Sequence, residues 1–420
     1  MNFKSSLIKI LVIILLLIQP FGNLLRVNHA QLQTEVFGLQ TIITGCIIVL
    51  GFIFGYFYRG IRDYKAFLAY ILFTILGSLM TFIDPQTTHL TLRVFLQNIY
   101  YITLAIIISN LKFSFNELKL IGITYTLSFC FIAVLSLLDF KNILNIPGFN
   151  LAMGSREIVG EYAMRMSNLS GPFTTRTTFG NYSAVAMGSA IGALFMTSLF
   201  KNKLLNAFCL IAVAINFIAA LQSLSRGLIL SFIFAFIYIL YTNLVAFKES
   251  LKIFLPIILL GFFGSAFLFL FKDYFYILLN FTNSLSFTEA SHDISSSFRF
   301  RVWLENLTSI RVWIMGKGFS PTYIAESYGG RDAHNTFITL FRVLGLPGII
   351  LLIFTFKKPV KYMLKCNNPV ALPFVCGIIS YLAYGLTHTA WNFAVFWIFI
   401  GITINLCKNH YHQPDRRYRP

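Results

Sequence analysis

Twelve apolar stretches alternate with short polar connections along this chain of 420 residues, and no other feature constrains its fold as strongly. Each stretch runs for about 17 to 22 residues, the length that a helix needs to cross a hydrocarbon core about 30 Å thick. Backbone polar groups must be satisfied internally in lipid, so such stretches form helices or closed barrel strands. Barrel strands alternate in polarity over about ten residues, and these stretches do not. The sequence therefore predicts an all-α polytopic membrane protein with about twelve transmembrane helices.

The predicted spans leave one large polar loop, residues 272–334, between the ninth and tenth spans. With 57% apolar and only 11% charged residues, the composition gives no sign of a soluble domain. Residues 1–420 are therefore predicted to form a single integral membrane domain. The spans are residues 7–25, 36–57, 66–83, 91–109, 120–137, 179–200, 204–222, 228–244, 253–271, 335–356, 366–386 and 390–406.

Threading these spans up and down divides the 33 Lys and Arg residues into two sets that differ in type. One face collects 14 Lys and 5 Arg, which is the positive-inside pattern of a cytoplasmic face. The other face collects 3 Lys and 11 Arg, a surplus that orientation does not require. We therefore expect both termini to be cytoplasmic and the 272–334 loop to be periplasmic. Guanidinium suits bidentate recognition of phosphate, so the arginine surplus points to a phosphate-bearing ligand.

The net charge of +18 does not indicate a nucleic-acid partner, because the cations are scattered over loop ends on both faces. Orientation and attraction to anionic lipid head groups explain them better. The six cysteines lie within apolar spans or at their inner ends, and none has CxxC spacing. This pattern argues against a disulfide framework and against a zinc site, so no metal is expected.

A tight turn, Ser223-Leu224-Ser225-Arg226-Gly227, joins the seventh and eighth spans on the arginine-rich face. The helix that starts there offers unpaired backbone N–H groups to an anion, with Ser225 at the N-cap. An arginine at a helix N-terminus opposes the helix dipole unless an anion lies between them. Arg226 is thus a candidate anion ligand, and an interfacial arginine that snorkels to water is the alternative.

Asp332-Ala333-His334-Asn335 stands at the outer mouth of the tenth span. The unperturbed pKa of histidine, about 6.5, suits proton transfer at neutral pH. Asp332 would either orient the ring or cap the helix, and a structural histidine at the interface is the alternative. Arg342, a charge inside the same span, should face the bundle interior or a wet cavity.

Arg299-Phe300-Arg301-Val302-Trp303 lies upstream within the long loop. Apolar residues recur there at helical spacing, which predicts a short amphipathic helix on the membrane surface. They are Phe300, Trp303, Leu304, Leu307 and Ile310. The glycines of Gly316-Lys317-Gly318 are a weak turn signal without the spacing of a phosphate loop.

In their order and spacing, these pieces resemble the O-antigen ligase and polymerase family of bacterial inner-membrane proteins. The resemblance covers roughly residues 220–350 and includes Ser225-Arg226-Gly227, Arg299 four residues before Trp303, Gly316, Gly318, His334-Asn335, Phe337, Leu340, Gly345 and Gly348. Gly171-Pro172-Phe173 with Arg176 is similar to the segment that the family has before the sixth span. Many members have a glutamate where this chain has Val343, beside Arg342, so the role of that glutamate is open here.

The resemblance implies transfer of a glycan from undecaprenyl diphosphate to an acceptor hydroxyl at the periplasmic face, without a metal or another cofactor. The acceptor is the lipid A–core in the ligase branch and another lipid-linked repeat unit in the polymerase branch. His334 would be the catalytic residue. The diphosphate ligands would be Arg226, Arg299, Arg301 and Arg176, and the supporting residues would be Asn335, Asp332 and Ser225.

Two functions from other classes remain. A polysaccharide transporter or flippase also has about twelve spans, but transporters often carry charges deep in their spans. Here the spans are nearly uncharged, although Arg342 lies well inside one of them. A scaffold without catalytic activity would leave the outer arginine surplus unexplained. The sequence therefore favours a ligase, with a repeat-unit polymerase as the nearest alternative.

Overall fold

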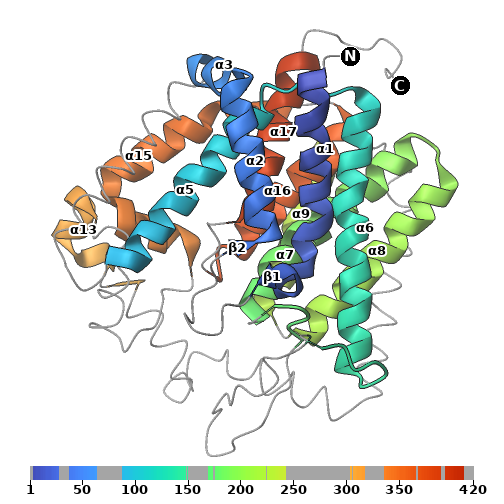
Figure 1. Ribbon diagram of the computed structural model, residues 1–420. Coiled ribbons are helices and arrows are strands. Elements are labelled where there is room, and N and C mark those ends of the chain that lie inside the picture. Colours follow the sequence, from blue (N-terminus) through green and yellow to red (C-terminus); the bar gives the residue numbers. More distant parts are fainter. Residues whose placement is uncertain are drawn as a thin grey trace, which may run out of the picture.

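The computed structural model describes residues 3–27, 37–63, 88–147, 149, 169–173, 176–223, 225–242, 303–304, 306–316, 335–365, 368–388 and 393–410. Within these residues the protein is helical (Figure 1). The described strands are β1 (Arg26–Val27) and β2 (Phe37–Gly38), a short antiparallel pair.

The helices follow the apolar stretches of the sequence. They are α1 (Phe3–Ile18), η1 (Gln19–Leu25), α2 (Leu39–Ile53), α3 (Tyr56–Asp63), α5 (Thr88–Ile108), α6 (Phe115–Phe140), α7 (Arg176–Leu199), α8 (Lys203–Gln222), α9 (Arg226–Tyr241), α13 (Ile310–Met315), α15 (Thr336–Lys365), η2 (Pro369–Ala371), α16 (Leu372–Tyr384) and α17 (Ala394–His410).

Ten of the twelve predicted spans coincide with helices, and the other two, 66–83 and 253–271, lie outside the described residues. Within the described residues, five helices are long and apolar enough to cross a membrane, and the other apolar helices are shorter, at 10–17 residues. The five are Phe3–Gly22, Phe115–Phe140, Thr178–Leu199, Lys203–Gln222 and Thr336–Phe354. The helical membrane-protein class is confirmed, while the count of twelve and the 272–334 loop stay predictions.

Helices α6, α7, α8 and α9 run in alternating directions through the bundle (Figure 1). The starts of α7, α9 and α15 meet the ends of α8 and α16 at one end of it, which lies lowest in Figure 1. We call it the outer end, because the sequence predicts that it faces the periplasm. The start of α1 and the end of α17 lie at the opposite, inner end.

The inner end carries an ion pair between Lys9 and Glu117. Lys9 Nζ donates to both carboxylate oxygens of Glu117, at 3.0 and 2.8 Å. Glu117 also completes a capping box with Ser114 at the start of α6. Nearby, Lys119 Nζ lies 5.0 Å from the centre of the Phe200 ring. Lysine side chains thus contact acidic and aromatic groups at this end of the bundle. It is the end where the positive-inside pattern predicted the lysine-rich, cytoplasmic face.

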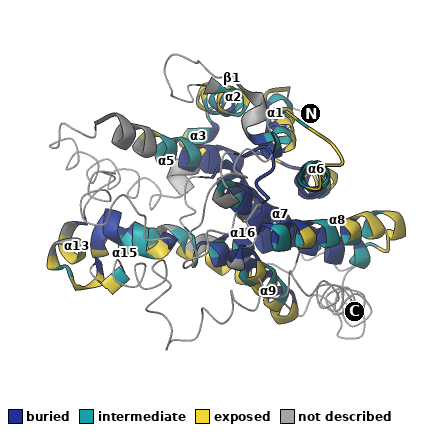
Figure 2. Ribbon diagram, turned by 90° about the horizontal axis from the view of Figure 1, so that it is seen from below, coloured by how far each residue is buried: buried dark blue, intermediate teal, exposed yellow. Residues whose placement is uncertain are grey.

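Helices α7 and α16 form the centre of the bundle, and exposed positions gather on the flanks of α8, α9 and α15 (Figure 2). A Cβ atom added at Gly188 would lie 2.7 Å from the carbonyl carbon of Cys376 on α16. One added at Gly192 would lie 2.6 Å from the backbone nitrogen of Pro373. The two glycines are four residues apart, the small-xxx-small spacing that lets helix backbones touch in a membrane.

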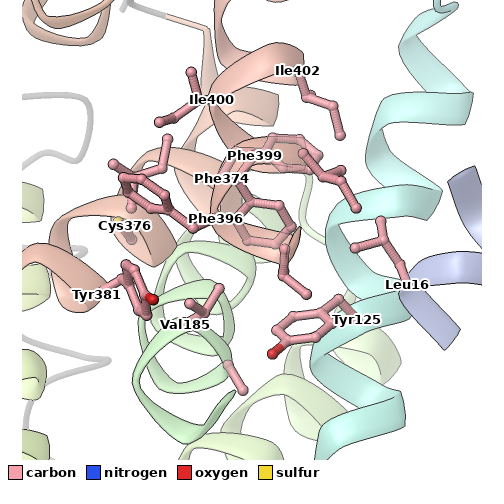
Figure 3. Packing of buried hydrophobic residues seen from close by; sticks show 14 of the residues in the cluster. Leu16, Tyr125, Val185, Phe374, Cys376, Tyr381, Phe396, Phe399, Ile400 and Ile402 are labelled. Atoms are coloured by element: carbon pink, nitrogen blue, oxygen red, sulfur yellow. The ribbon is translucent and has the colours of Figure 1, made fainter. Parts of the chain in front are cut away.

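Aromatic side chains fill the space around this contact (Figure 3). The Phe399 ring of α17 meets Tyr125 of α6 edge-on at 5.7 Å between centroids, and Phe374 of α16 at 5.2 Å. Tyr381 of α16 packs on Phe396 of α17 at 4.9 Å. These fully buried rings join helices from both halves of the chain into one core.

Part of the predicted surface helix lies within the described residues. Trp303, Leu304 and residues 306–308 are helical, while Phe300 lies outside the described residues. The side chains of Leu304 and Leu307 are exposed, whereas Asn306 is buried. An apolar face therefore points away from the protein, as expected of a helix that rests on a membrane surface.

The α7–α16 contact predicts that Gly188→Val will destabilise the protein. Valine at position 188 would overlap the α16 backbone, which has no side-chain rotamer to adjust. We expect a loss of about 3 kcal/mol or more in the free energy of unfolding, the upper range for overpacking. Ala207→Val, at an exposed position of α8, is the matched control and should change it by less than about 0.5 kcal/mol. Unfolding of the purified variants in detergent measures both, and equal stability would contradict the close contact.

Candidate functional site

Three helix starts and one helix end meet at the outer end of the bundle. The starts belong to α7, α9 and α15, and the end is that of α16, followed by the turn from Gly385 to His388. Added Cβ atoms at Gly180 on α7 and at Gly227 on α9 would lie 2.6 and 2.9 Å from the Tyr384 side chain. Both helix starts therefore touch the last residue of α16 directly.

Asn335 fixes the start of α15. Its side-chain Oδ1 accepts hydrogen bonds from the backbone N–H groups of Phe337 and Ile338, at 2.9 and 3.1 Å. Its Nδ2 donates to the carbonyl oxygen of Leu386 at 2.8 Å. The buried Asn335 thus caps α15 and also ties it to the turn after α16.

Thr336 adds two hydrogen bonds to the same turn. Its backbone N–H donates to the Gly385 carbonyl at 2.7 Å, and its Oγ1 donates to the His388 carbonyl at 2.9 Å. A Cβ atom added at Gly385 would lie 2.9 Å from Thr336 Oγ1, so glycine allows this approach. The backbone that follows His334 is therefore held firmly against α16, while His334 itself lies outside the described residues.

Helix α9 begins at Arg226, as the sequence predicted, and Ser225 is its N-cap residue. Ser225 Oγ makes no capping hydrogen bond, and this buried oxygen has no hydrogen-bond partner among the described residues. Gly227 lies so close to the turn after α16 that an added Cβ would be 3.1 Å from His388 Nδ1. The α9 start thus presents backbone donors and an unused hydroxyl at the outer end.

Helix α7 begins at Arg176, directly after the Gly171-Pro172-Phe173 segment. Gly171 has a φ of +55°, a conformation that favours glycine. Phe173 stacks on Tyr182 at 4.5 Å, and Leu169 donates its backbone N–H to the Gln222 carbonyl at 3.3 Å. The segment is therefore packed between α7 and the end of α8.

Gly316, the residue after α13, lies beside the middle of α15. Gly316, with a φ of +71°, lies against the α15 backbone, where an added Cβ would be 2.7 Å from the Gly345 nitrogen. Gly345 itself has a φ of +66° and kinks α15. Trp313 of α13 packs on Phe341 at 4.9 Å. The weak glycine signal of the sequence therefore marks a close backbone contact.

The buried cation of α15 has the environment that the sequence predicted. Arg342 is 7% exposed, and its neighbour Val343 is 5% exposed. The Val343 backbone also lies against Gly316. The position where many family members have a glutamate is therefore an apolar packing position in this chain.

The structure places some of the predicted site residues and not others. Ser225 and Asn335 are described, and so are the backbones of Arg176 and Arg226, which lie at the same end of the bundle. The side chains of these two arginines, and the whole of Arg299, Arg301, Asp332 and His334, lie outside what the structure describes. Their roles stay predictions.

Sequence reasoning missed His388. Its ring stacks on Tyr384 with centroids 4.4 Å apart and planes within 2°, and its Nδ1 lies 2.9 Å from Thr387 Oγ1. The available signal was a histidine in a short connection on the arginine-rich face. Nothing local in the sequence tied it to Arg226 or His334, because α9 and α15 reach it only in the folded protein.

Residues 210–353 match the family model described as O-antigen ligase. The match covers about a third of the chain and supports membership of the O-antigen ligase family. The match includes the α9 start, Gly316 and the outer half of α15, which confirms the resemblance found in the sequence. It ends before α16, so His388 lies outside it. No curated protein matches the chain.

The bond from Asn335 to Leu386 predicts the effect of Asn335→Asp on stability. Aspartate keeps the oxygen that caps α15 but loses the donor to the Leu386 carbonyl, and it brings a negative charge to that oxygen. We expect a loss of roughly 1–3 kcal/mol in the free energy of unfolding. Asn368→Asp is the matched control, because Asn368 Oδ1 caps η2 at the inner end by accepting from Val370 N–H. If both variants unfold like the unmodified protein, the tie between α15 and α16 contributes little.

Proposed function

We propose that this protein is an O-antigen ligase that transfers a glycan from undecaprenyl diphosphate to a hydroxyl group of the lipid A–core. The observation that carries the proposal is the meeting of three helix starts at one end of the bundle. Two of them begin with arginines, Arg176 and Arg226, and the third follows His334. The family match over residues 210–353 supports a glycosyl-transferring enzyme.

The reaction needs few functional groups, because a glycosyl diphosphate is already activated. The acceptor hydroxyl oxygen attacks the anomeric carbon, and the bond from that carbon to the phosphate oxygen breaks. Undecaprenyl diphosphate leaves with the electron pair, and the hydroxyl proton passes to a base. The protein must hold two phosphates, stabilise charge on the leaving group and orient the hydroxyl. Arginines can supply the positive charge, so the proposal includes no metal ion.

The start of α9 suits the diphosphate for two independent reasons. Its first backbone N–H groups and the positive end of its dipole favour an anion. The buried Ser225 Oγ, which does not cap the helix, is a further donor. We assign Arg226 and Arg299 to the diphosphate, with Arg176 or Arg301 assisting.

His334 would accept the proton of the acceptor hydroxyl or hold that hydroxyl in line for attack. Support comes from Asn335 and Thr336, which fix the backbone directly after it to the turn after α16. A group that transfers protons needs such a fixed position. Asp332 would orient the imidazole ring.

The proposal also includes the inner membrane, with both termini in the cytoplasm and the site in the periplasm. The lysine-rich inner end, represented by Lys9 and Lys119, supports this orientation. A reporter fused after Lys203 should behave as cytoplasmic, and one inserted near Ser291 as periplasmic. A cytoplasmic result at Ser291 would put the arginines of that loop in the wrong compartment for the reaction.

The surface polysaccharide of a deletion strain tests the function. A ligase predicts loss of all long chains from the lipid A–core while lipid-linked polymer accumulates. Core that carries a single repeat unit would instead indicate a repeat-unit polymerase, which uses the same donor. Unchanged surface polysaccharide would contradict both.

Arg226 should be required for donor binding. A hydrogen bond to a charged group contributes about 1.5–3 kcal/mol, so Arg226→Ala should lower kcat/KM by at least ten- to a hundredfold. Arg226→Lys should also be impaired, because lysine keeps the charge but not the two-pronged geometry. Arg59→Ala, an exposed arginine beside Tyr56 on α3, is the control. Full activity of both Arg226 variants at normal expression would support a snorkelling arginine instead.

His334→Ala should abolish transfer and leave binding of the lipid-linked donor largely intact, because the arginines hold the diphosphate. Donor binding and glycan transfer are therefore measured separately on the purified variant. Near-normal transfer would reduce His334 to a structural residue. Loss of binding together with transfer would argue against a role limited to the acceptor.

A further inference from the structure

A groove runs along the inner half of α15, at the opposite end of the helix from the candidate site. It has a volume of about 430 Å³. Its lining residues recur at intervals of three and four, so they share one face of the helix. They are Ile353, Phe356, Lys357, Val360, Lys361 and Leu364.

The other side of this helix half is fixed to the bundle. The Phe356 ring packs on Trp397 of α17 with centroids 5.8 Å apart. Met363 is buried, and its carbonyl oxygen accepts a hydrogen bond from the Tyr238 hydroxyl of α9 at 2.9 Å. These contacts with α9 and α17 set the rotation of α15, and with it the direction in which the groove opens.

The apolar walls of the groove face away from the protein. The side chains of Ile353, Val360 and Leu364 are 61, 42 and 53% exposed. At the surface of a bundle that crosses a membrane, lipid is the surrounding medium for such side chains. The groove therefore opens toward the bilayer.

Two lysines stand in the same groove. Lys357 and Lys361 are exposed and four residues apart, so their side chains are neighbours on the helix surface. Neither makes a hydrogen bond or an ion pair with another described residue, whereas Lys9 at the same end of the bundle pairs with Glu117. Two ammonium groups are thus available to one anion.

The polarity of the groove changes along its length. The tenth span predicted from the sequence, residues 335–356, ends within the groove. Ile353 therefore lies in the hydrocarbon, and Lys357 and Lys361 lie at the level of the lipid head groups, where lysine side chains reach water. A ligand that matches the groove must be apolar at one end and anionic at the other.

We propose that this groove binds an anionic phospholipid from the leaflet at the inner end of the bundle. An acyl chain lies along Ile353 and Phe356, and the phosphate lies between Lys357 and Lys361. Basic residues beside a membrane-spanning helix at the cytoplasmic face attract anionic head groups. The inference does not rest on the proposed function, because the groove and the candidate site are at opposite ends of α15.

The experiment titrates the purified full-length protein in detergent with phosphatidylglycerol, and separately with phosphatidylethanolamine that has the same acyl chains. Native mass spectrometry counts the lipids that stay bound. Both lipids carry a phosphate, but only phosphatidylglycerol has a net negative charge, so the comparison isolates the charge of the head group.

Three paired variants test the lysines. Lys357→Gln combined with Lys361→Gln removes both charges and keeps residues that favour a helix. Lys357→Arg combined with Lys361→Arg keeps the charges. Lys112→Gln combined with Lys203→Gln is the matched control, because it removes two charges from exposed positions in other connections of the inner end.

We expect the double glutamine variant to weaken binding of phosphatidylglycerol about thirtyfold, since each lysine near the lipid surface contributes roughly fivefold. Its binding of phosphatidylethanolamine should barely change. The double arginine variant and the control should bind phosphatidylglycerol normally. Val360→Trp fills the groove without removing a lysine and should weaken binding severalfold.

Four outcomes would overturn the inference. Equal binding of the two lipids by the unmodified protein would mean that the groove does not select by charge. An equal loss in the control would point to the charge of the whole inner end. Normal binding by Val360→Trp would place the lipid outside the groove. A dimer of the unmodified protein that the double glutamine variant loses would identify the groove as an interface between two copies of the chain.

Discussion

The backbone contact between α7 and α16 determines where every other part of the outer end lies. Lipid supplies no hydrophobic force between helices, so close packing and hydrogen bonds must hold them. A stripe of small residues on α7 lets α16 approach so closely that glycines of α7 contact the α16 backbone. The stripe consists of Gly180, Ala184, Gly188 and Gly192. Because the contact runs from Leu372 to Tyr384, it fixes both the position of α16 along α7 and the place of the turn that follows.

The turn after α16 then supplies hydrogen-bond acceptors to the start of α15. A helix end leaves carbonyl groups without partners, and a helix start leaves N–H groups without partners. Here the carbonyls of Gly385, Leu386 and His388 accept from Asn335 and Thr336, so the two helix termini complete each other. The starts of α7, α9 and α15 share this region with the ends of α8 and α16, so three positive dipole ends lie beside two negative ones.

The elements that depend on local pattern were predictable from the sequence, and those that depend on distant contacts were not. The length of the apolar stretches predicted ten spans that coincide with helices of the structure. Residue types near the span ends indicated the helix starts at Arg226 and Thr336. The spacing of Gly188 and Gly192 is visible in the sequence, but its partner on α16 is not. In the sequence, Gly316 gave only a weak turn signal. Its contact with the backbone at the Gly345 kink of α15 forms only in the folded protein. His388 was missed for the same reason.

The chemistry and the geometry of the candidate site come from different parts of the chain. The segment that matches the O-antigen ligase family, residues 210–353, holds Ser225, Arg226 and His334. The turn that ties Asn335 and Thr336 in place and touches Gly227 lies beyond that segment, after α16. The matching segment therefore does not fix the geometry of this end of the bundle by itself, because residues 385–388 hold the start of α15 in place.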